Sequence, residues 1–537
     1  MTTPTASLPT RTRRDGEPMD AFMDRVRAIY GGPVTLVRLL ERACTARPGK
    51  LALVDTVGNR WTYAEMAERV RRLIGGLAAA GIPPRASVAL MMRNHADYVA
   101  AYYAVITGGW VLVPLNVRLA PRELAYILDN ARVAAVLADA EFRGVLAQAE
   151  RLRGQKVPVF WRGPGGDGSY ERLGEAPAQP FAPAEEDDVA AIYYTSGTTG
   201  QPKGAMISHR NMAAVAQQNV EAWGFDSPDV VELEISPLFH VSFQEFGPPV
   251  HHAGGTLVVD NFSPRRALDL IEQEGINAFF AVPSMLFMMM DALRETPRDT
   301  RQVRLVKYGG APMPVERLDA VQAMFPNALL VQGFGQTEST GMIAVTWPDE
   351  VRPYPLSTGR AISGCIIAIV DDDDRPLPPG TVGEIVARGP QIFLGYFGNP
   401  AASAETLRNG WLHTGDLGYL DEGGRLYVVD RKKDLIIRGG QNIYSAEVEA
   451  ALYLHPAVAE AAVVGKPDPL YGEVVVAFVR LKPDTPATAE DLDRFMVQQI
   501  AAYKRPVAYY FVDDFPRTAS GKVRKVELRE RVRNETV

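Results

Sequence analysis

The first half of the chain alternates hydrophobic patterns of helical and strand period. Thr62-Tyr63-Ala64-Glu65 is typical of a capping box, and apolar residues then recur at helical spacing until Gly81. The apolar run 87–92 predicts a strand. Further elements are expected in the order helix 96–106, strand 110–114, helix from 120 and strand 134–138. This alternation predicts an α/β fold with mostly parallel sheets and helices on both faces.

The second half changes in character. Residues 161–188 are rich in Gly, Pro and acidic residues and predict a surface excursion, whereas 355–429 predicts a small β subdomain of short strands and glycine turns. A compact α+β unit follows, with helices expected at 445–454 and 488–502 and strands at 459–464, 473–481 and 508–512. We therefore expect a loosely ordered tail at 1–30, a large domain at 31–429 and a small mobile domain at 430–537.

Composition excludes several function classes. The 537 residues carry a net charge of −7 without a basic block, which argues against a nucleic-acid partner. The longest apolar run, 98–115, is broken by glycine and proline and predicts buried helix and strand in place of a membrane span. Only Cys44 and Cys365 are present and lie far apart, which favours a reducing compartment and a cytoplasmic location.

The segment 194–204, Tyr-Thr-Ser-Gly-Thr-Thr-Gly-Gln-Pro-Lys-Gly, is the most informative in the chain. It holds four Ser/Thr hydroxyls, three glycines and one lysine directly after an apolar strand pattern. Glycines let backbone N–H groups converge on an anion, hydroxyls donate further hydrogen bonds, and the lysine adds charge. The spacing is not that of a Walker A loop. The segment predicts a polyphosphate site.

Further motifs follow it in a fixed order. They are Tyr-Gly-Gly-Ala-Pro at 308–312, Gln-Gly-Phe-Gly-Gln-Thr-Glu at 332–338, Gly-Trp-Leu-His-Thr-Gly-Asp at 410–416, Asp-Arg-Lys-Lys-Asp at 430–434, Gly-Gly-Gln-Asn-Ile-Tyr at 439–444 and Pro-Arg-Thr-Ala-Ser-Gly-Lys at 516–522. Together they resemble the adenylate-forming superfamily of acyl-CoA synthetases, peptide-synthetase adenylation domains and luciferases. The resemblance covers nearly the whole chain from about residue 35.

The resemblance implies an ATP and Mg²⁺ site. Its phosphate-binding residues would be Thr195, Ser196, Gly197, Thr198, Thr199 and Lys203. Its adenine site would comprise Gly309, Gly310, Ala311, Gly333, Phe334 and Gly335, with Thr337 near phosphate and Glu338 at the metal. The family usually has tyrosine where this chain has Phe334, which keeps stacking and loses a phenol hydrogen bond.

The resemblance also implies the remaining roles. Asp416 and Arg431 would bind ribose, Asp430 would be the hinge, Gly439 and Gly440 would line the acceptor tunnel, and Lys522 would be the catalytic lysine. Its cation would stabilise the negative charge that collects during attack on the α-phosphate. The family usually has proline where this chain has Ser445, which we expect to be a helix N-cap.

The substrate side is indicated by Leu238-Phe239-His240-Val241-Ser242. Amino-acid-activating relatives usually carry an aspartate where this chain has His240, and an imidazole cannot hold an α-ammonium group. The expected substrate is a carboxylic acid without an α-amino group, and His240 joins Thr195, Glu338 and Lys522 as a candidate catalytic residue; a packed core histidine is the alternative. His251-His252 lacks a third ligand for zinc, and 285–290 is expected to be helix core.

The expected reaction forms an acyl-adenylate and then a thioester. No carrier domain is expected after Lys522, so coenzyme A is the leading free acceptor. Rotation about Asp430 would exchange Lys522 for Gly439-Gly440 between the two half-reactions. Three alternatives stay open: an amide synthetase that uses an amine, a stand-alone amino-acid adenylation enzyme, and a non-enzymatic nucleotide-binding regulator. A homodimer is also left open.

Overall fold

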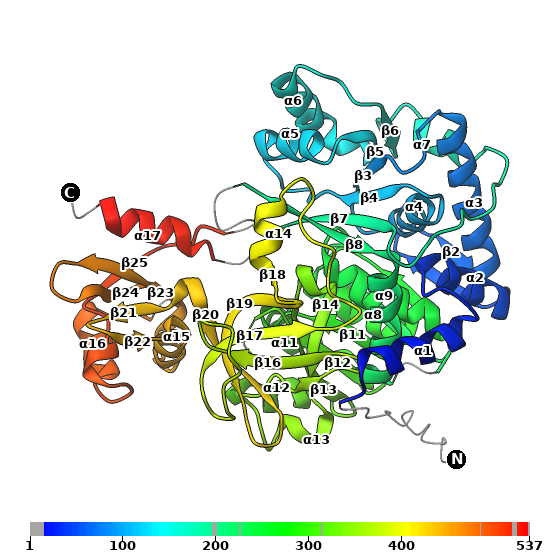
Figure 1. Ribbon diagram of the computed structural model, residues 1–537. Coiled ribbons are helices and arrows are strands. Elements are labelled where there is room, and N and C mark those ends of the chain that lie inside the picture. The colour runs from blue at the N-terminus through cyan, green and yellow to red at the C-terminus, as the bar shows by residue number, and fades with distance from the viewer. Residues whose placement is uncertain are drawn as a thin grey trace, which may run out of the picture. The chain divides into compact units, whose positions relative to one another are not determined.

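The structure is a computed structural model that describes residues 16–195, 201–224, 227–311, 313, 315–483, 485–517 and 523–534 (Figure 1). The chain forms two compact units. Unit 1 comprises the described residues of 1–197, 201–367 and 387–413, and unit 2 comprises those of 368–386 and 414–537. Each unit is described by itself.

A nine-stranded sheet is the larger of two sheets in unit 1. Its strand order is β15–β14–β13–β12–β11–β9–β10–β1–β2, with antiparallel strands only towards the two ends. The strands are β1 (Leu51–Asp55), β2 (Arg60–Thr62), β9 (Val231–Glu234), β10 (Thr256–Val259), β11 (Ala278–Ala281), β12 (Leu305–Gly309), β13 (Leu329–Gln336), β14 (Gly341–Val345) and β15 (Arg360–Ala361). Since the inner strands are parallel, the segments that follow them meet at one edge, where α/β proteins bind ligands.

The second sheet has the order β6–β5–β3–β4–β7–β8 and is parallel except for β8. Its strands are β3 (Ser87–Met91), β4 (Val111–Pro114), β5 (Val133–Asp139), β6 (Val159–Arg162), β7 (Val189–Thr195) and β8 (Lys203–Ser208). The two strands β7 and β8 flank the predicted phosphate loop. The predicted α/β class with mostly parallel sheets is confirmed.

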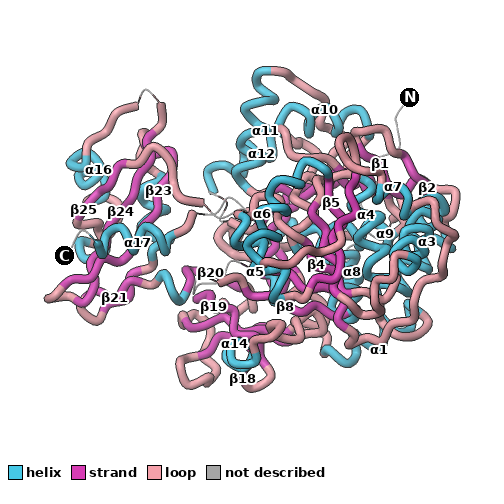
Figure 2. The backbone as a smooth tube through the Cα atoms, turned by 90° about the horizontal axis from the view of Figure 1, so that it is seen from above, coloured by secondary structure: helices cyan, strands magenta, loops and turns pink. Residues whose placement is uncertain are grey.

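Helices surround these sheets, as Figure 2 shows. The helices of unit 1 are α1 (Met19–Tyr30), α2 (Leu36–Ala46), α3 (Tyr63–Ala79), α4 (Ala96–Thr107), α5 (Pro121–Asn130), α6 (Arg143–Arg153), α7 (Ser169–Leu173), α8 (His209–Trp223), α9 (Val241–Ala253), α10 (Pro264–Glu274), α11 (Pro283–Glu295), α12 (Val315–Met324), α13 (Pro348–Val351) and α14 (Pro400–Thr406). Helix α4 is buried along its whole length and contacts strands of both sheets, because its side chains are mostly apolar or aromatic all round.

Two five-stranded sheets account for the rest of the chain. One contains β16 (Ile366–Val370), β17 (Gly383–Arg388), β18 (Leu407–Arg408), β19 (Trp411–Leu420) and β20 (Leu426–Arg431). The other contains β21 (Ile436–Arg438), β22 (Gln441–Ile443), β23 (Val458–Asp468), β24 (Gly472–Leu481) and β25 (Ala508–Phe511), accompanied by α15 (Ser445–Tyr453), α16 (Ala489–Met496) and α17 (Lys525–Asn534). The first is the small β subdomain that glycine turns and short strands predicted, and the second is the predicted α+β unit.

Most local predictions are confirmed, and three are wrong. The Thr62–Glu65 capping box is present, and the strand expected at 87–92 is β3. Residues 19–30, expected in a loose tail, instead form α1, because Phe22, Val26 and Tyr30 share one helical face that is buried. The helix expected at 488–502 ends at Met496. Ser445 is the first residue of α15 and not its N-cap, which is Tyr444.

The apolar run 98–115 is divided between α4 and β4, as expected. Within the described residues no helix is long and apolar enough to cross a membrane. The last segment of unit 2 begins at Thr414. The predicted domain boundary at Asp430 concerns movement and stays a prediction.

Candidate active site

Three predicted site segments of unit 1 follow parallel strands of the nine-stranded sheet. His240 comes after β9, Gly310 after β12 and Glu338 after β13. Gly309 pairs with Gly333 in the ladder, and a Cβ at Gly309 would lie 2.5 Å from the Gly333 carbonyl oxygen. Only glycine therefore allows this approach of the two predicted adenine segments. Gly310 has φ of +73°, which glycine adopts without strain.

Other members of the adenine and phosphate sets lie on the same edge. Gly335 meets the neighbouring strand so closely that a Cβ would lie 1.9 Å from the Gly341 carbonyl oxygen. Phe334 is half-buried, and Ala311 is exposed, so both retain surface for a ligand. Thr337 begins the short 3₁₀ helix Thr337–Ser339, whose second residue is Glu338. These residues, which belong to separate motifs in the sequence, thus lie close together in the structure.

Glu338 is joined to the phosphate-loop strand through Tyr396. The Tyr396 hydroxyl donates to Glu338 Oε1 at 2.7 Å, and Lys203 Nζ lies 5.0 Å from the centre of the Tyr396 ring. The Phe393 N–H also donates to the Glu338 carbonyl at 2.9 Å. Burial, reinforced by the Glu338 charge, raises the pKa of Tyr396, so its hydroxyl stays a donor. Sequence reasoning missed Tyr396, although Phe-Leu-Gly-Tyr-Phe at 393–397 is an aromatic-rich signal.

The phosphate loop itself is described at its two ends. Thr195 ends β7 and pairs with Lys203, the first residue of β8. The predicted residues Ser196, Gly197, Thr198 and Thr199 lie outside the described residues, as does Lys522. Their roles stay predictions.

His240 is exposed and caps a helix. Its Nδ1 accepts from the Ser242 N–H at 3.2 Å, at the N-terminus of α9. The alternative of a packed core histidine is therefore wrong. The segment before it is held by Asn94, whose amide donates to the Ser236 carbonyl at 2.7 Å and accepts from the Leu238 N–H at 3.0 Å.

A buried charge cluster lies beneath these segments and was not predicted. Lys307 of β12 forms an ion pair with Glu232 of β9, and both side chains are almost fully buried. Burial raises the pKa of Glu232 and lowers the pKa of Lys307. Burial also raises the pKa values of Glu234 and Glu245 to about 8, so both are protonated at neutral pH. The cluster then has no net charge, because the Lys307–Glu232 pair is neutral overall whether the proton is on Lys307 or on Glu232.

In unit 2 the predicted ribose residues lie together. Asp416 and Arg431 are ladder partners in β19 and β20, and Arg431 Nε lies 3.5 Å from Asp416 Oδ1. Asp416 is buried, whereas Arg431 is half exposed. The backbone of Asp416 is held in the β19–β20 ladder, and its carboxylate has two acceptor oxygens. It can therefore accept hydrogen bonds from two neighbouring hydroxyls, such as those of a ribose.

Asp430, the predicted hinge, is bound to the helix that follows it. Its carboxylate accepts from the Ser445 hydroxyl at 3.2 Å and from the Ala446 N–H at 3.3 Å. Lys525 donates to the same Ser445 hydroxyl at 2.8 Å and pairs with Glu449 at 2.7 Å. Asp430 thus caps α15, the role that was expected of Ser445. Ser445, which stands where the family usually has proline, connects Asp430 to Lys525 of α17.

The predicted acceptor loop is a tight glycine turn. Gly439 and Gly440 have φ of +56° and +81°, between β21 and β22. The Gly439 N–H donates to the Tyr471 carbonyl at 2.7 Å, and the Arg438 guanidinium lies 5.0 Å from the centre of the Tyr471 ring. The turn therefore presents backbone without side chains, as a narrow passage would require.

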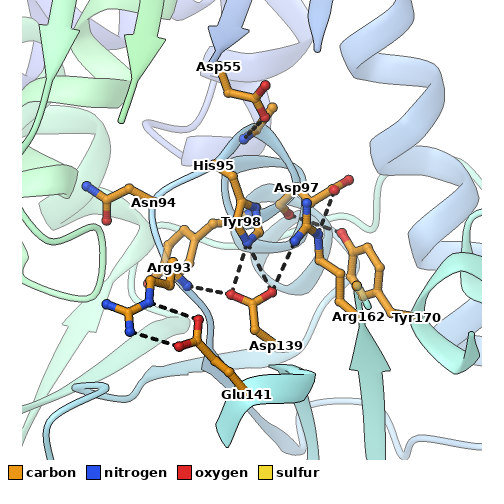
Figure 3. A network of polar contacts seen from close by, with 12 residues as sticks. Asp55, Arg93, Asn94, His95, Asp97, Tyr98, Asp139, Glu141, Arg162 and Tyr170 are labelled. Atoms are coloured by element: carbon orange, nitrogen blue, oxygen red, sulfur yellow. Dashed lines mark hydrogen bonds and ion pairs between the residues drawn. The ribbon is translucent and has the colours of Figure 1, made fainter. Parts of the chain in front are cut away.

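A polar cavity of about 370 Å³ lies elsewhere on the carboxyl edges of the two sheets. Figure 3 shows its centre, where Asp139 binds His95 and Arg162. Burial opposes a charge on Asp139, but the hydrogen bonds from His95 and the Arg93 N–H, with the Arg162 charge, hold its pKa below its usual value. The charges in this cavity pair with one another, which makes it a structural network.

The remaining chemistry-bearing residues have structural roles. His251 is buried and binds the Tyr103 hydroxyl at 2.8 Å, and His252 binds Gln217 at 2.9 Å. No group of three or more His, Cys, Asp or Glu side chains in the described part of the chain is arranged to hold a metal. Cys44 and Cys365 are buried and unpaired. Leu286, Met289 and Met290 of α11 are core residues, but Met288 is 52% exposed, so the expectation of helix core at 285–290 holds only in part.

Comparisons with known proteins agree with this geometry. The model of the family described as AMP-binding enzyme matches residues 40–397, and that of the AMP-binding enzyme C-terminal domain matches 447–522. Feruloyl-CoA synthase from Amycolatopsis sp is 36% identical over 501 residues, which cover 93% of this chain and 98% of the relative.

Solved structures are similar over the same length. The o-succinylbenzoate CoA synthetase from Bacillus subtilis, in complex with its acyl-adenylate intermediate, has a TM-score of 0.82 and 31% identity over 91% of this chain and 97% of that chain. A second structure of it, in complex with ATP and a magnesium ion, has a TM-score of 0.82. An amide bond synthetase from Marinactinospora thermotolerans has a TM-score of 0.82 and 31% identity over 92% of this chain and 99% of that chain.

Proposed function

Because the chain belongs to the AMP-binding enzymes, we propose that it is an ATP-dependent carboxylic acid–CoA ligase. The observation that carries the proposal is the contact series Lys203–Tyr396–Glu338, which joins the phosphate-loop strand to the segment after β13. A cation at the start of β8 and a carboxylate after β13, joined through one tyrosine, fit the phosphates of a nucleotide and its metal ion.

In the first half-reaction a carboxylate oxygen of the acid attacks the α-phosphorus of ATP. The bond from that phosphorus to the β-bridging oxygen breaks, and pyrophosphate leaves with its electrons. Lys203 contributes positive charge beside the departing phosphates. Lys522 is proposed to stabilise the charge on the carboxylate and α-phosphate oxygens, in accordance with its place in the Pro-Arg-Thr-Ala-Ser-Gly-Lys motif.

Glu338 fits a magnesium ion. One of its oxygens accepts from Tyr396, which leaves the other for a hard cation, and Mg²⁺ usually takes one or two protein carboxylates with substrate phosphates and water. A single carboxylate also agrees with the lack of a multi-ligand metal group among the described residues. When bound, the ion neutralises phosphate charge; Tyr396 and the Phe393 N–H orient the residue that would hold it.

In the second half-reaction a thiolate attacks the acyl carbon of the adenylate, the bond from that carbon to the phosphate oxygen breaks, and AMP leaves. We propose that a domain comprising 430–537 turns about Asp430 to present Gly439-Gly440 to the acceptor. The binding of the Asp430 side chain by Ser445 and Ala446 supports this, because it gives the junction a defined connection to the small domain.

The proposed substrate is a carboxylic acid without an α-amino group. His240 stands where amino-acid-activating relatives usually have aspartate, and its exposure leaves it open to a ligand. The relatives' names, feruloyl-CoA synthase and o-succinylbenzoate CoA synthetase, favour an acid that carries an aromatic ring. An amide synthetase is the second candidate, favoured by the 31% identity to the Marinactinospora thermotolerans enzyme. A cytoplasmic enzyme is proposed from the unpaired cysteines.

The test measures pyrophosphate release from MgATP with a panel of aliphatic, aromatic and α-amino acids. Product masses are then recorded with coenzyme A or with amines as acceptor. We expect release with acids that lack the α-amino group, and an acyl-CoA product. Release with α-amino acids alone would contradict the substrate class, amide formation without thioester would favour the second candidate, and no release with any acid would reject the enzyme proposal.

A further inference from the structure

Asn94 lies in the segment between β3 and α4, and it is buried. Its two neighbours in sequence bind within the network beside the six-stranded sheet, because the Arg93 N–H and the His95 ring both contact Asp139. Figure 3 shows that the Asn94 side chain points away from Asp139. Asn94 therefore contacts a different part of unit 1, which its hydrogen bonds identify.

The Asn94 side chain joins two strand ends of the nine-stranded sheet. Its Nδ2 donates to the Ser236 carbonyl at 2.7 Å and to the Asp260 carbonyl at 2.9 Å, and its Oδ1 accepts from the Leu238 N–H at 3.0 Å. Ser236 and Leu238 come after β9, and Asp260 comes directly after β10. A primary amide supplies two donors and an acceptor in one plane, so this residue type fits these three backbone groups.

Leu238 belongs to a β-turn that ends at His240. The His240 N–H donates to the Pro237 carbonyl at 2.9 Å, which is the bond that closes such a turn. The Leu238 side chain is fully buried, whereas His240 at the end of the turn is exposed. The turn is thus held from inside the protein by the buried leucine and by the bond of its N–H to Asn94. The placement of the His240 imidazole depends on both.

The His240 ring is oriented by the helix that follows the turn. Its Nδ1 accepts from the Ser242 N–H at 3.2 Å. A ring nitrogen that accepts a hydrogen bond carries no proton, so the neutral imidazole has its proton on Nε2. This N–H is a donor of the kind that a carboxylate accepts, and such a bond weakens steeply as its geometry departs from the ideal. A shift of the turn would therefore weaken a hydrogen bond from His240 to a carboxylic acid.

We propose that Asn94 is a positioning residue, which holds the turn 237–240 so that His240 meets the carboxylate of the substrate. It thereby sets the KM for the acid independently of the KM for ATP. The inference rests on the proposed function, because the acid is the one activated at that site. In the described chain the partners of Asn94 follow β9 or β10, whereas the predicted adenine residues belong to β12 and β13 or follow β12. The KM for MgATP should therefore not depend on Asn94.

The test measures two KM values of Asn94→Ala, one for an acid that the panel shows to be accepted and one for MgATP. We expect the loss of the bonds to the turn to raise the KM for the acid by about 10-fold or more and to change the KM for MgATP by less than about 2-fold. Asn277→Ala is the matched control, because its amide binds the other end of β9. Asn277 Oδ1 accepts from the Val231 N–H at 3.0 Å, and its Nδ2 donates to the Asp229 carbonyl at 2.7 Å. The control should keep both KM values, even if its melting temperature falls.

A double-mutant cycle tests whether Asn94 acts through His240. If it does, Asn94→Ala should change kcat/KM for the acid much less in the His240→Ala background than in the wild type, because the residue that it positions is already gone. An effect of undiminished size in that background overturns the inference. If His240→Ala releases no pyrophosphate, the difference between the two KM values decides alone.

The outcomes separate this inference from the ligase proposal. Wild-type KM values in Asn94→Ala, an equal rise of both KM values, or the same rise for the acid in Asn277→Ala overturns the inference and leaves the ligase proposal standing. No pyrophosphate release by the wild type with any acid rejects the ligase proposal and the inference with it. Circular dichroism checks that each variant folds. If Asn94→Ala does not fold, Asn94→Asp decides, because it keeps the shape of the side chain but supplies at most one of the two donors; an unchanged KM for the acid there overturns the inference.

Discussion

Replacing Tyr396 by phenylalanine tests whether its hydroxyl positions Glu338 for magnesium. The change removes the 2.7 Å hydrogen bond to Glu338 Oε1 and keeps the ring that faces Lys203 at 5.0 Å. A hydrogen bond to a charged group contributes about 1.5–3 kcal/mol. Glu338 is half-buried, so we discount this to about 1–2 kcal/mol, a factor of roughly 5–30 in an equilibrium constant.

The expected result is a KM for MgATP raised by about that factor, with a higher half-saturating Mg²⁺ concentration. The assay is pyrophosphate release at fixed ATP over a series of magnesium concentrations. Tyr453→Phe, which changes a 45% exposed tyrosine of α15, is the matched control. The reasoning is refuted if Tyr396→Phe has the wild-type magnesium dependence, or if only its melting temperature falls.

Three further predictions concern residues between 416 and 522. Lys522→Ala should lower adenylate formation by on the order of 10²–10³-fold and spare thioester formation from preformed acyl-adenylate; equal loss in both half-reactions, measured separately, would contradict the role of Lys522. Asp416→Ala should raise the KM for ATP, because each ribose hydrogen bond to a carboxylate contributes roughly 1.5–3 kcal/mol, without changing which acid is preferred; an unaltered KM would exclude Asp416 as the ribose ligand. Ser445→Ala should lower the free energy of unfolding by about 1–3 kcal/mol in urea titrations, because Asp430 and Lys525 both lose a buried hydroxyl partner, and unchanged stability would show that these bonds contribute little.

Features that depend on nearby residues could be predicted from the sequence. The Thr62–Glu65 capping box, the strand β3 and the glycine turn at Gly439-Gly440 each arise within a few residues. Helix α1 carried a local signal too, since Phe22, Val26 and Tyr30 are spaced at four residues, but the proline- and arginine-rich start of the chain obscured it.

Features that depend on residues far apart in the chain could not be predicted from the sequence. Glu338 and Tyr396 are separated by 58 positions, and Lys307 and Glu232 by 75, so their pairing exists only once β8, β9, β12 and β13 are in place. Ser445 is instructive for the same reason. Its sequence context suits an N-cap, but Asp430, fifteen residues earlier, reaches the same helix end and displaces it from that role.

The double attachment of Asp430 constrains how a rotation at this residue can occur. Its backbone belongs to β20, where Asp430 pairs with Leu417, while its carboxylate is bonded to the start of α15. A turn of the chain after Arg431, which leaves all of β20 in its ladder, must therefore release the Ser445 and Ala446 contacts. A turn at or before Asp430 must instead open the end of β20 and carry Arg431 away from Asp416. The first route exchanges two side-chain bonds for water, and the second breaks up the predicted ribose site. The molecule thus has a mechanical reason to pivot on the carboxyl side of Arg431, next to Asp430, while AMP is still held.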